Sequence, residues 1–177
     1  PPPPTHAPDP ENGSGDISID PDSNGGPQAD PSCTLGAAPG CSTYIANGLT
    51  LQLIGKLNSR SNGVTFSPIS HDSVRCAGAC TPWMQSAAAD HLIAATVERG
   101  DYITINSGYR SSAQQYMLRS WYLDGNRCGI ALAAKPGTSN HEGGLALDTS
   151  YYNYWRPSLE NHGWDWHGTS DPVHFDY

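Results

Sequence analysis

The stretch SNHEGGLALD, residues 139–148, decides the fold and the chemistry of this chain. Its apolar run at 145–147 predicts a short strand that holds Asp148 rigidly at its end. The glycine pair 143–144 permits a turn before that strand, so His141 can reach the same point as Asp148. A histidine and a carboxylate brought together in this way are candidate metal ligands.

A third candidate ligand lies in the sequence DPVHF, residues 171–175. A catalytic zinc site needs three protein ligands from His and carboxylate, with a further position open for water. His141, Asp148 and His174 can supply that set. The helical HExxH zinc motif is absent, because Leu145 stands where its second His belongs.

Composition excludes several other classes of function. Over 177 residues, Lys+Arg number 9 against Asp+Glu 17, which gives a formal net charge of −8. Because no run of basic residues supplies the electrostatic footprint of nucleic-acid binding, we expect no nucleic-acid partner. The apolar runs are far shorter than the roughly 18 to 20 residues of a membrane span, so we expect none.

The chain divides by composition near residue 32. Residues 1–32 hold nine of the fifteen prolines and six acidic residues, with no Lys or Arg. Such a segment buries too little apolar surface to offset the entropy of ordering it. We therefore interpret residues 1–32 as an acidic linker or tail and residues 33–177 as a single domain.

Periodicity within that domain predicts both helices and strands. Helices are expected over 49–57 and over 112–122. A further helix is expected to run from an N-cap at Thr81 to about Glu98 and to end at Gly100. Strands are expected over 102–106, 145–149 and 173–177. Helices and strands mixed without regular alternation indicate an α+β domain.

The cysteines at 33, 41, 76, 80 and 128 do not have the spacing of a structural zinc site and favour a disulfide framework. We expect Cys33 to pair with Cys41. Of the three remaining cysteines two can pair and one is left over, and the sequence does not choose among them. Disulfides and a processed-looking tail favour a secreted or periplasmic, wall-associated protein.

Three motifs in order along the chain resemble those of one family. SGYRS at 107–111 with Gln115, the stretch at 139–148, and GW at 163–164 followed by DPVHF are similar to motifs of the zinc D-alanyl-D-alanine peptidases, the VanY-like carboxypeptidases. These enzymes share a fold with lysostaphin-type enzymes and the hedgehog signalling domain. The resemblance covers about residues 76–177. It implies a small, mostly antiparallel sheet with flanking helices around one zinc site.

The resemblance also implies roles for individual residues. His141, Asp148 and His174 correspond to the zinc ligands, and Asp171 to the catalytic acid or base, although many relatives have Glu there. Arg110 corresponds to an arginine that holds a substrate carboxylate or the developing oxyanion. Four further positions are expected at the substrate: Ser111, Gln115, Trp166 and His167.

The function predicted from these residues is a secreted, monomeric zinc peptidase that removes terminal D-Ala from peptidoglycan stem peptides. An endopeptidase cutting L-Ala-D-Glu-type bonds within the stem, a non-catalytic wall-binding module that keeps the zinc, and a Cys-His amidase using Cys128 or Cys80 remain alternatives. A serine D-Ala-D-Ala peptidase is excluded, because neither Lys56 nor Lys135 has a serine three positions earlier.

Overall fold

The structure is a computed structural model that describes residues 40–60 and 63–177. The predicted tail over 1–32 and Cys33 therefore lie outside the described residues. The helices are η3 (Thr43–Ala46), α1 (Asn47–Asn58), α2 (Ser86–Arg99), α3 (Ser112–Leu123), η4 (Arg127–Gly129), α4 (Asn140–Gly143) and α5 (Tyr152–Asn161). The strands are β1 (Phe66–Pro68), β2 (Val74–Cys76), β3 (Trp83–Gln85), β4 (Ile103–Ile105), β5 (Ala146–Asp148), β6 (Asp165–Trp166) and β7 (His174–Asp176).

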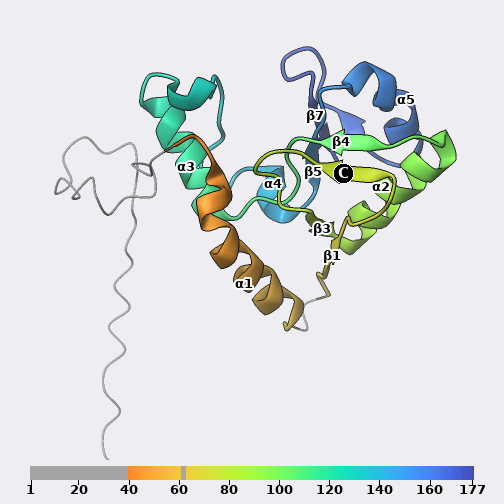
Figure 1. Ribbon diagram of the computed structural model, residues 1–177, viewed down its shortest axis with the longest axis horizontal. Helices are drawn as coiled ribbons and strands as arrows, with labels where there is room; N and C mark the ends of the chain where they lie inside the picture. Colours follow the sequence, from red (N-terminus) through yellow and green to blue (C-terminus); the bar gives the residue numbers. More distant parts are fainter. Residues whose placement is uncertain (1–39, 61–62) are drawn as a thin grey trace, which may run out of the picture. The chain divides into compact units, whose positions relative to one another are not determined.

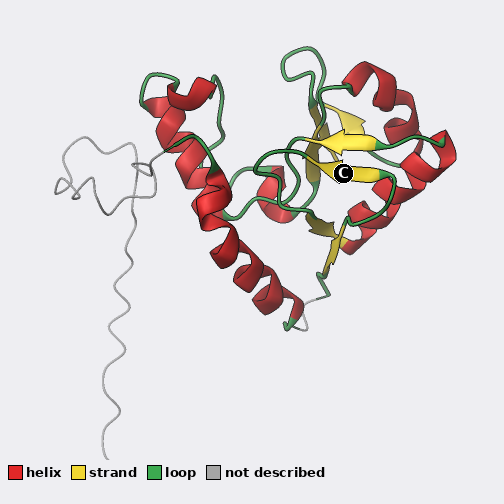
Figure 2. Ribbon diagram, in the orientation of Figure 1, coloured by secondary structure: helices red, strands yellow, loops and turns green. Residues whose placement is uncertain are grey.

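The strands form small sheets flanked by helices (Figures 1 and 2). β1 pairs with β3 antiparallel, β2 pairs with β4 in parallel, and β7 lies between β5 and β6 with antiparallel pairing on both sides. An isolated bridge between Ser107 and Asp148 connects the end of β4 to the end of β5. The α+β class expected from the sequence is confirmed.

The main hydrophobic core lies between these strands and the helices α2 and α5. The alanine-rich α2 packs closely because Ala88, Ala89 and Ala95 are buried together with Leu92. Trp155 of α5 is also buried, at 1% exposure. Burial of such side chains is the dominant favourable term in folding, so this core fixes β5 and β7 in place.

The helix α2 begins later than the sequence predicts. Thr81 is not its N-cap, because residues 83–85 pair with β1 as strand β3 before the helix starts at Ser86. Tertiary pairing overrides the local Thr-Pro signal. The predicted end at Gly100 is confirmed, since this residue has the left-handed φ of 71° that favours glycine after a helix.

The disulfides also differ from the expectation. Cys41 pairs with Cys128 across 87 residues, so the predicted Cys33–Cys41 bridge is wrong. Cys76 pairs with Cys80, which leaves Cys128 over from its group of three. The physical reason is that η4 returns beside the start of η3, within 5.3 Å between the Cα atoms of Cys41 and Cys128.

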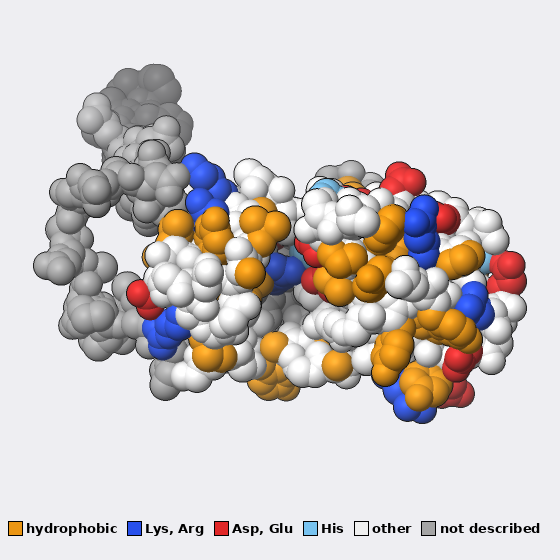
Figure 3. Space-filling model, turned by 90° about the horizontal axis from the view of Figure 1, so that it is seen from above, with side chains coloured by type: hydrophobic (Ala, Val, Ile, Leu, Met, Phe, Trp, Pro, Cys, Tyr) orange, Lys and Arg blue, Asp and Glu red, His pale blue; other side chains and the backbone are white. Residues whose placement is uncertain are grey.

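On the surface that Figure 3 shows, acidic and basic side chains are interspersed with hydrophobic ones. Among the described residues, no helix combines the length and the apolar character that crossing a membrane would need.

Candidate metal centre and catalytic cleft

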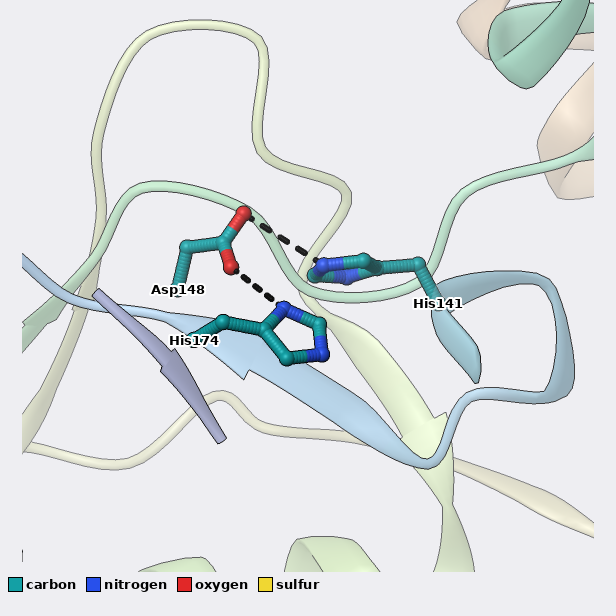
Figure 4. A group of neighbouring side chains, drawn as sticks. All are labelled: His141, Asp148 and His174. Carbon is teal, nitrogen blue, oxygen red and sulfur yellow. Dashed lines mark hydrogen bonds and ion pairs between the residues drawn. The ribbon is translucent and has the colours of Figure 1, made fainter. Parts of the chain in front are cut away.

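The side chains of three potential metal ligands, His141, Asp148 and His174, point towards one another (Figure 4). His141 comes from α4, Asp148 from the end of β5, and His174 from the start of β7. Oδ2 of Asp148 lies 3.3 Å from Nε2 of His141, and Oδ1 lies 2.9 Å from Nδ1 of His174. One ligand atom from each residue lies within 4.8 Å of the others, which is close enough to hold one metal ion.

Strand register and one glycine produce this convergence. Asp148 and His174 are direct partners in the antiparallel β5–β7 ladder. His141 follows from the turn that ends α4, where Gly144 has a φ of +69°. A Cβ at Gly144 would lie 2.5 Å from Cε1 of Phe66 and 2.9 Å from the backbone nitrogen of Gln85, so no larger residue fits.

The second nitrogen of each histidine is also held. Nδ1 of His141 donates to the carbonyl oxygen of Gly108 at 2.8 Å. Nε2 of His174 lies 2.9 Å from Oδ1 of Asp176 and donates to that carboxylate. With this nitrogen donating outward, each imidazole in its neutral form would direct the lone pair of its other nitrogen towards the common centre, as a metal ligand must. Outer partners that fix the tautomer in this way are characteristic of histidines that bind metals, so these residues fit a zinc ion.

The charges of His141, Asp148 and His174 act strongly on one another. Burial raises the pKa of Asp148, but hydrogen bonds and charges from His141 and His174 outweigh it and hold that pKa well below its usual value. Burial lowers the pKa of His174, but its bonds to Asp148 and Asp176 outweigh that effect and raise the pKa to about 9. For His141 burial dominates, and its pKa is lowered. A divalent cation would replace these protons as the positive charge beside Asp148.

A second group of possible ligands shares His174 with the first. It consists of His167, His174 and Asp176. The side chain of His167 is 52% exposed and that of Asp176 is 28% exposed, whereas those of His141 and His174 are 4% and 15% exposed. Because the first group is more buried and uses Nδ1 of His174, while Asp176 occupies Nε2, we assign Asp176 to the outer layer of the site.

The metal-ligand group opens into a cleft of about 290 Å³. Four other residues with predicted roles line it: Arg110, Gln115, His167 and Asp171. The loop at 132–134 contributes a further part of the lining. Asp171 is half-buried, and its negative charge acts on Arg110 across the cleft.

Arg110 is fixed by a network of neutral and charged partners. It donates from Nη1 to Oε1 of Gln115 at 2.9 Å and from Nη2 to Oγ of Ser107 at 3.0 Å. Nη2 also lies 3.8 Å from Oδ2 of Asp148. Burial lowers the pKa of Arg110 and the charge of Asp148 opposes this shift. An arginine remains protonated even so, which supplies a fixed positive charge beside the ligand group.

Gln115 is a positioning residue in this network. Its Oε1 accepts from Arg110, and its Nε2 donates to the carbonyl oxygen of Ala134 at 2.8 Å. Both ends of the amide are therefore occupied by the protein. The residue connects Arg110 to the loop that forms one wall of the cleft, rather than offering a free amide to a substrate.

Two of the predicted substrate contacts lie elsewhere. Ser111 is the N-cap of α3, is 2% exposed, and bonds to Thr50 through its hydroxyl. Trp166 donates from Nε1 to the carbonyl oxygen of Pro172 at 2.8 Å and stacks on Tyr152. Neither side chain lines the cleft. The motif order placed them near the site, but their side chains are used for packing and capping.

Asp176 and the carbonyl oxygen of Gly108 are not among the site residues predicted from the sequence. Asp176 stands two residues after His174, so alternation along the strand places both side chains on one face. The sequence pattern could therefore have predicted that Asp176 lies near the ligand group. The carbonyl of Gly108 belongs to the SGYRS motif, but no side chain marks it. Nothing in the sequence shows that this backbone oxygen meets a histidine 33 residues away.

Comparison with protein families gives a match over residues 83–167 to the model described as VanY, D-alanyl-D-alanine carboxypeptidase. The domain is VanY-like. The match includes Arg110, His141 and Asp148 and ends at His167. It confirms the resemblance to the VanY-like carboxypeptidases that the three motifs indicate.

Among solved structures, a Zn(II) complex of a Glu-to-Ala mutant of the vancomycin-resistance D,D-pentapeptidase VanY from a VanB-type cassette is similar. The identity is 19% and the TM-score 0.44, over 66% of this chain and 80% of that one. A search of the curated proteins gives no match. The alternative of a Cys-His amidase is contradicted, because Cys80 and Cys128 both form disulfides.

Proposed function

We propose that this VanY-like domain is a secreted zinc carboxypeptidase that removes terminal D-Ala from peptidoglycan stem peptides. The observation that carries the proposal is the convergence of His141, Asp148 and His174 at the base of a cleft that also contains Arg110 and Asp171. Zinc is the cofactor that this ligand set fits, with two imidazole nitrogens and one carboxylate. The disulfides of Cys41 and of Cys76 support an oxidising compartment.

The residues around the ligand group divide the chemistry among them. Zinc, when bound, acts as a Lewis acid and makes water a better nucleophile near neutral pH. Asp171 is the carboxylate that accepts the proton of the attacking water and returns it to the leaving amine. Arg110 stabilises the negative charge that develops on the scissile carbonyl oxygen or binds the terminal carboxylate of the substrate. Asp148 and Gln115 keep its guanidinium in place.

The wall of the cleft favours cleavage at the end of a peptide. The loop that supplies Leu132 and Ala134 is fixed by Gln115 and by a bond from Nη1 of Arg119 to the carbonyl oxygen of Ala133 at 2.9 Å. The disulfide of Cys128 ties the preceding segment to the start of the domain. A wall held in this way, together with a buried arginine, suits recognition of a free carboxylate rather than of a chain that continues.

The test offers the zinc-loaded enzyme a pentapeptide muropeptide and its C-terminally amidated twin. The products are identified by mass spectrometry. We expect release of D-Ala from the first peptide and little reaction with the second. Equal cleavage of both between L-Ala and D-Glu would establish the endopeptidase instead. No cleavage of either, with stoichiometric zinc bound, would indicate a wall-binding module.

A further inference from the structure

A pocket lined by tyrosines lies outside the catalytic cleft, between β4 and the start of α5, which Figure 1 labels. Its volume is about 450 Å³, and its lining includes Tyr102, Tyr151 and Tyr154. These side chains are 47%, 67% and 46% exposed. Exposed aromatic residues gathered at one pocket mark a binding site more often than single exposed rings do.

Charged groups hold two of these rings in fixed orientations. The guanidinium carbon of Arg75 lies 3.6 Å from the ring centroid of Tyr102, and that of Arg99 lies 3.6 Å from the ring centroid of Tyr154. Asp101 accepts hydrogen bonds from the hydroxyl of Tyr154 at 2.9 Å and from the backbone nitrogen of Tyr102 at 2.7 Å. The rings are therefore ordered before any ligand arrives, which lowers the entropy cost of binding.

A row of residues along β4 runs from the tyrosine pocket towards Asp148 of the metal-ligand group. Residues 103 and 105 of β4 are buried, so Tyr102, Thr104 and Asn106 alternate onto the other face. Tyr102 and Thr104 line the tyrosine pocket, whereas Asn106 lines a second cavity of about 300 Å³ that Arg110 and Asp148 share. The row from 102 to 106 spans about 13 Å at roughly 3.3 Å per residue.

We propose that this tyrosine pocket binds the glycan strand of peptidoglycan, a polymer of N-acetylated amino sugars. Sugar rings present flat C–H faces that pack on aromatic rings, and their hydroxyl and amide groups bond to planar polar side chains such as those of Arg75 and Asp101. The interleaving of rings with such groups suits a sugar better than a purely apolar partner. The inference rests on the proposed function, because a stem peptide of five residues reaches about 17 Å from its sugar.

The experiment measures sedimentation of the full zinc-loaded chain with glycan strands from which all stem peptides have been removed. We expect the wild type to bind and the double variant Tyr102→Ala/Tyr151→Ala to bind roughly tenfold more weakly, because each ring contributes a modest packing energy. Tyr151→Phe keeps the ring and should bind almost as the wild type does. Tyr44→Ala removes a tyrosine that is 60% exposed elsewhere and serves as the matched control.

Hydrolysis of a free synthetic pentapeptide separates this inference from the proposed function. All four proteins should cleave it at equal kcat/KM, which also shows that each variant is folded. A wild type that does not sediment with stripped glycan, or a double variant that sediments as well as the wild type, would overturn the inference. Absence of peptide hydrolysis by the wild type would overturn the carboxypeptidase proposal alone, since binding to stripped glycan requires no cleavage.

Discussion

Replacing Asp176 tests whether the metal site is the buried group or its more exposed neighbour. In the structure Oδ1 of Asp176 accepts from Nε2 of His174 and from Nδ2 of Asn140, each at 2.9 Å, and its Oδ2 lies 3.4 Å from Nδ1 of His167. If the metal binds between His141, Asp148 and His174, Asp176 acts through the orientation of the His174 ring. If the metal instead binds to His167, His174 and Asp176, this carboxylate is a ligand.

The two assignments predict effects of different size. Loss of an outer partner typically weakens metal binding by about 10- to 100-fold, which corresponds to roughly 1.4 to 2.8 kcal/mol. We therefore expect Asp176→Ala to weaken zinc binding within that range while still binding one zinc per chain. Because the substrate cleft is retained, kcat/KM at saturating zinc should change much less than the affinity for zinc.

The assay is a competition titration of zinc against a chromophoric chelator, with metal content checked by elemental analysis. Asp165→Asn is the matched control, because Asp165 is an exposed carboxylate on β6 directly opposite Asp176 in the sheet. His141→Ala should abolish stoichiometric binding. The reasoning is refuted if Asp176→Ala binds no zinc while His141→Ala binds it normally, or if Asp176→Ala leaves the affinity unchanged.

Three further predictions follow from the same geometry. Asp171→Asn should retain zinc and lose turnover by roughly 10² to 10⁴, measured as kcat on a pentapeptide, and near-normal turnover would exclude Asp171 as the general base. Gly144→Ala should lower the free energy of unfolding by about 1 to 3 kcal/mol or more in a denaturant titration, whereas Gly143→Ala, whose Cβ would meet only the Leu145 side chain at 3.7 Å, should cost less. Because His174 in the metal-free protein has a pKa raised to about 9, its protonated form contributes stability that is fully present below about pH 6.5 and is lost as the pH rises through 9. Thermal unfolding in chelator should therefore show that contribution disappear over this window, while zinc affinity rises over the same window, and a flat profile for both would contradict the coupling.

Local patterns in the sequence carried most of the information about the ligand group. His141 and Asp148 stand seven residues apart, and the glycines and the apolar run between them determine the turn and the strand. Other features of the fold depend instead on contacts between residues that are far apart in the sequence. Pairing of Cys41 with Cys128, and of β3 with β1, depends on which segments meet in three dimensions, and no local signal states that.

Function and packing also compete for the same residue types. Ser111 and Gln115 both stand in a motif of the family, yet the hydroxyl of Ser111 caps a helix while the amide of Gln115 joins Arg110 to the cleft wall. A match to a family motif does not show whether the side chain at that position faces the substrate or packs inside the protein. Only the hydrogen-bond partners distinguish the two cases.

The pairing of Asp148 with His174, in contrast, follows from alternation once Leu147 and Phe175 are paired. Leu147 and Phe175 are both fully buried at 0% exposure and are direct partners in the β5–β7 ladder. Because successive side chains on a strand point to opposite faces, the residues next to them, Asp148 and His174, must share the face that opens to the cleft. A slip of the register by one residue would bury Asp148 and expose Leu147, so the hydrophobic core itself enforces the geometry of the ligands. The fold thus positions a costly pair of charged groups through the burial of an apolar pair beside it.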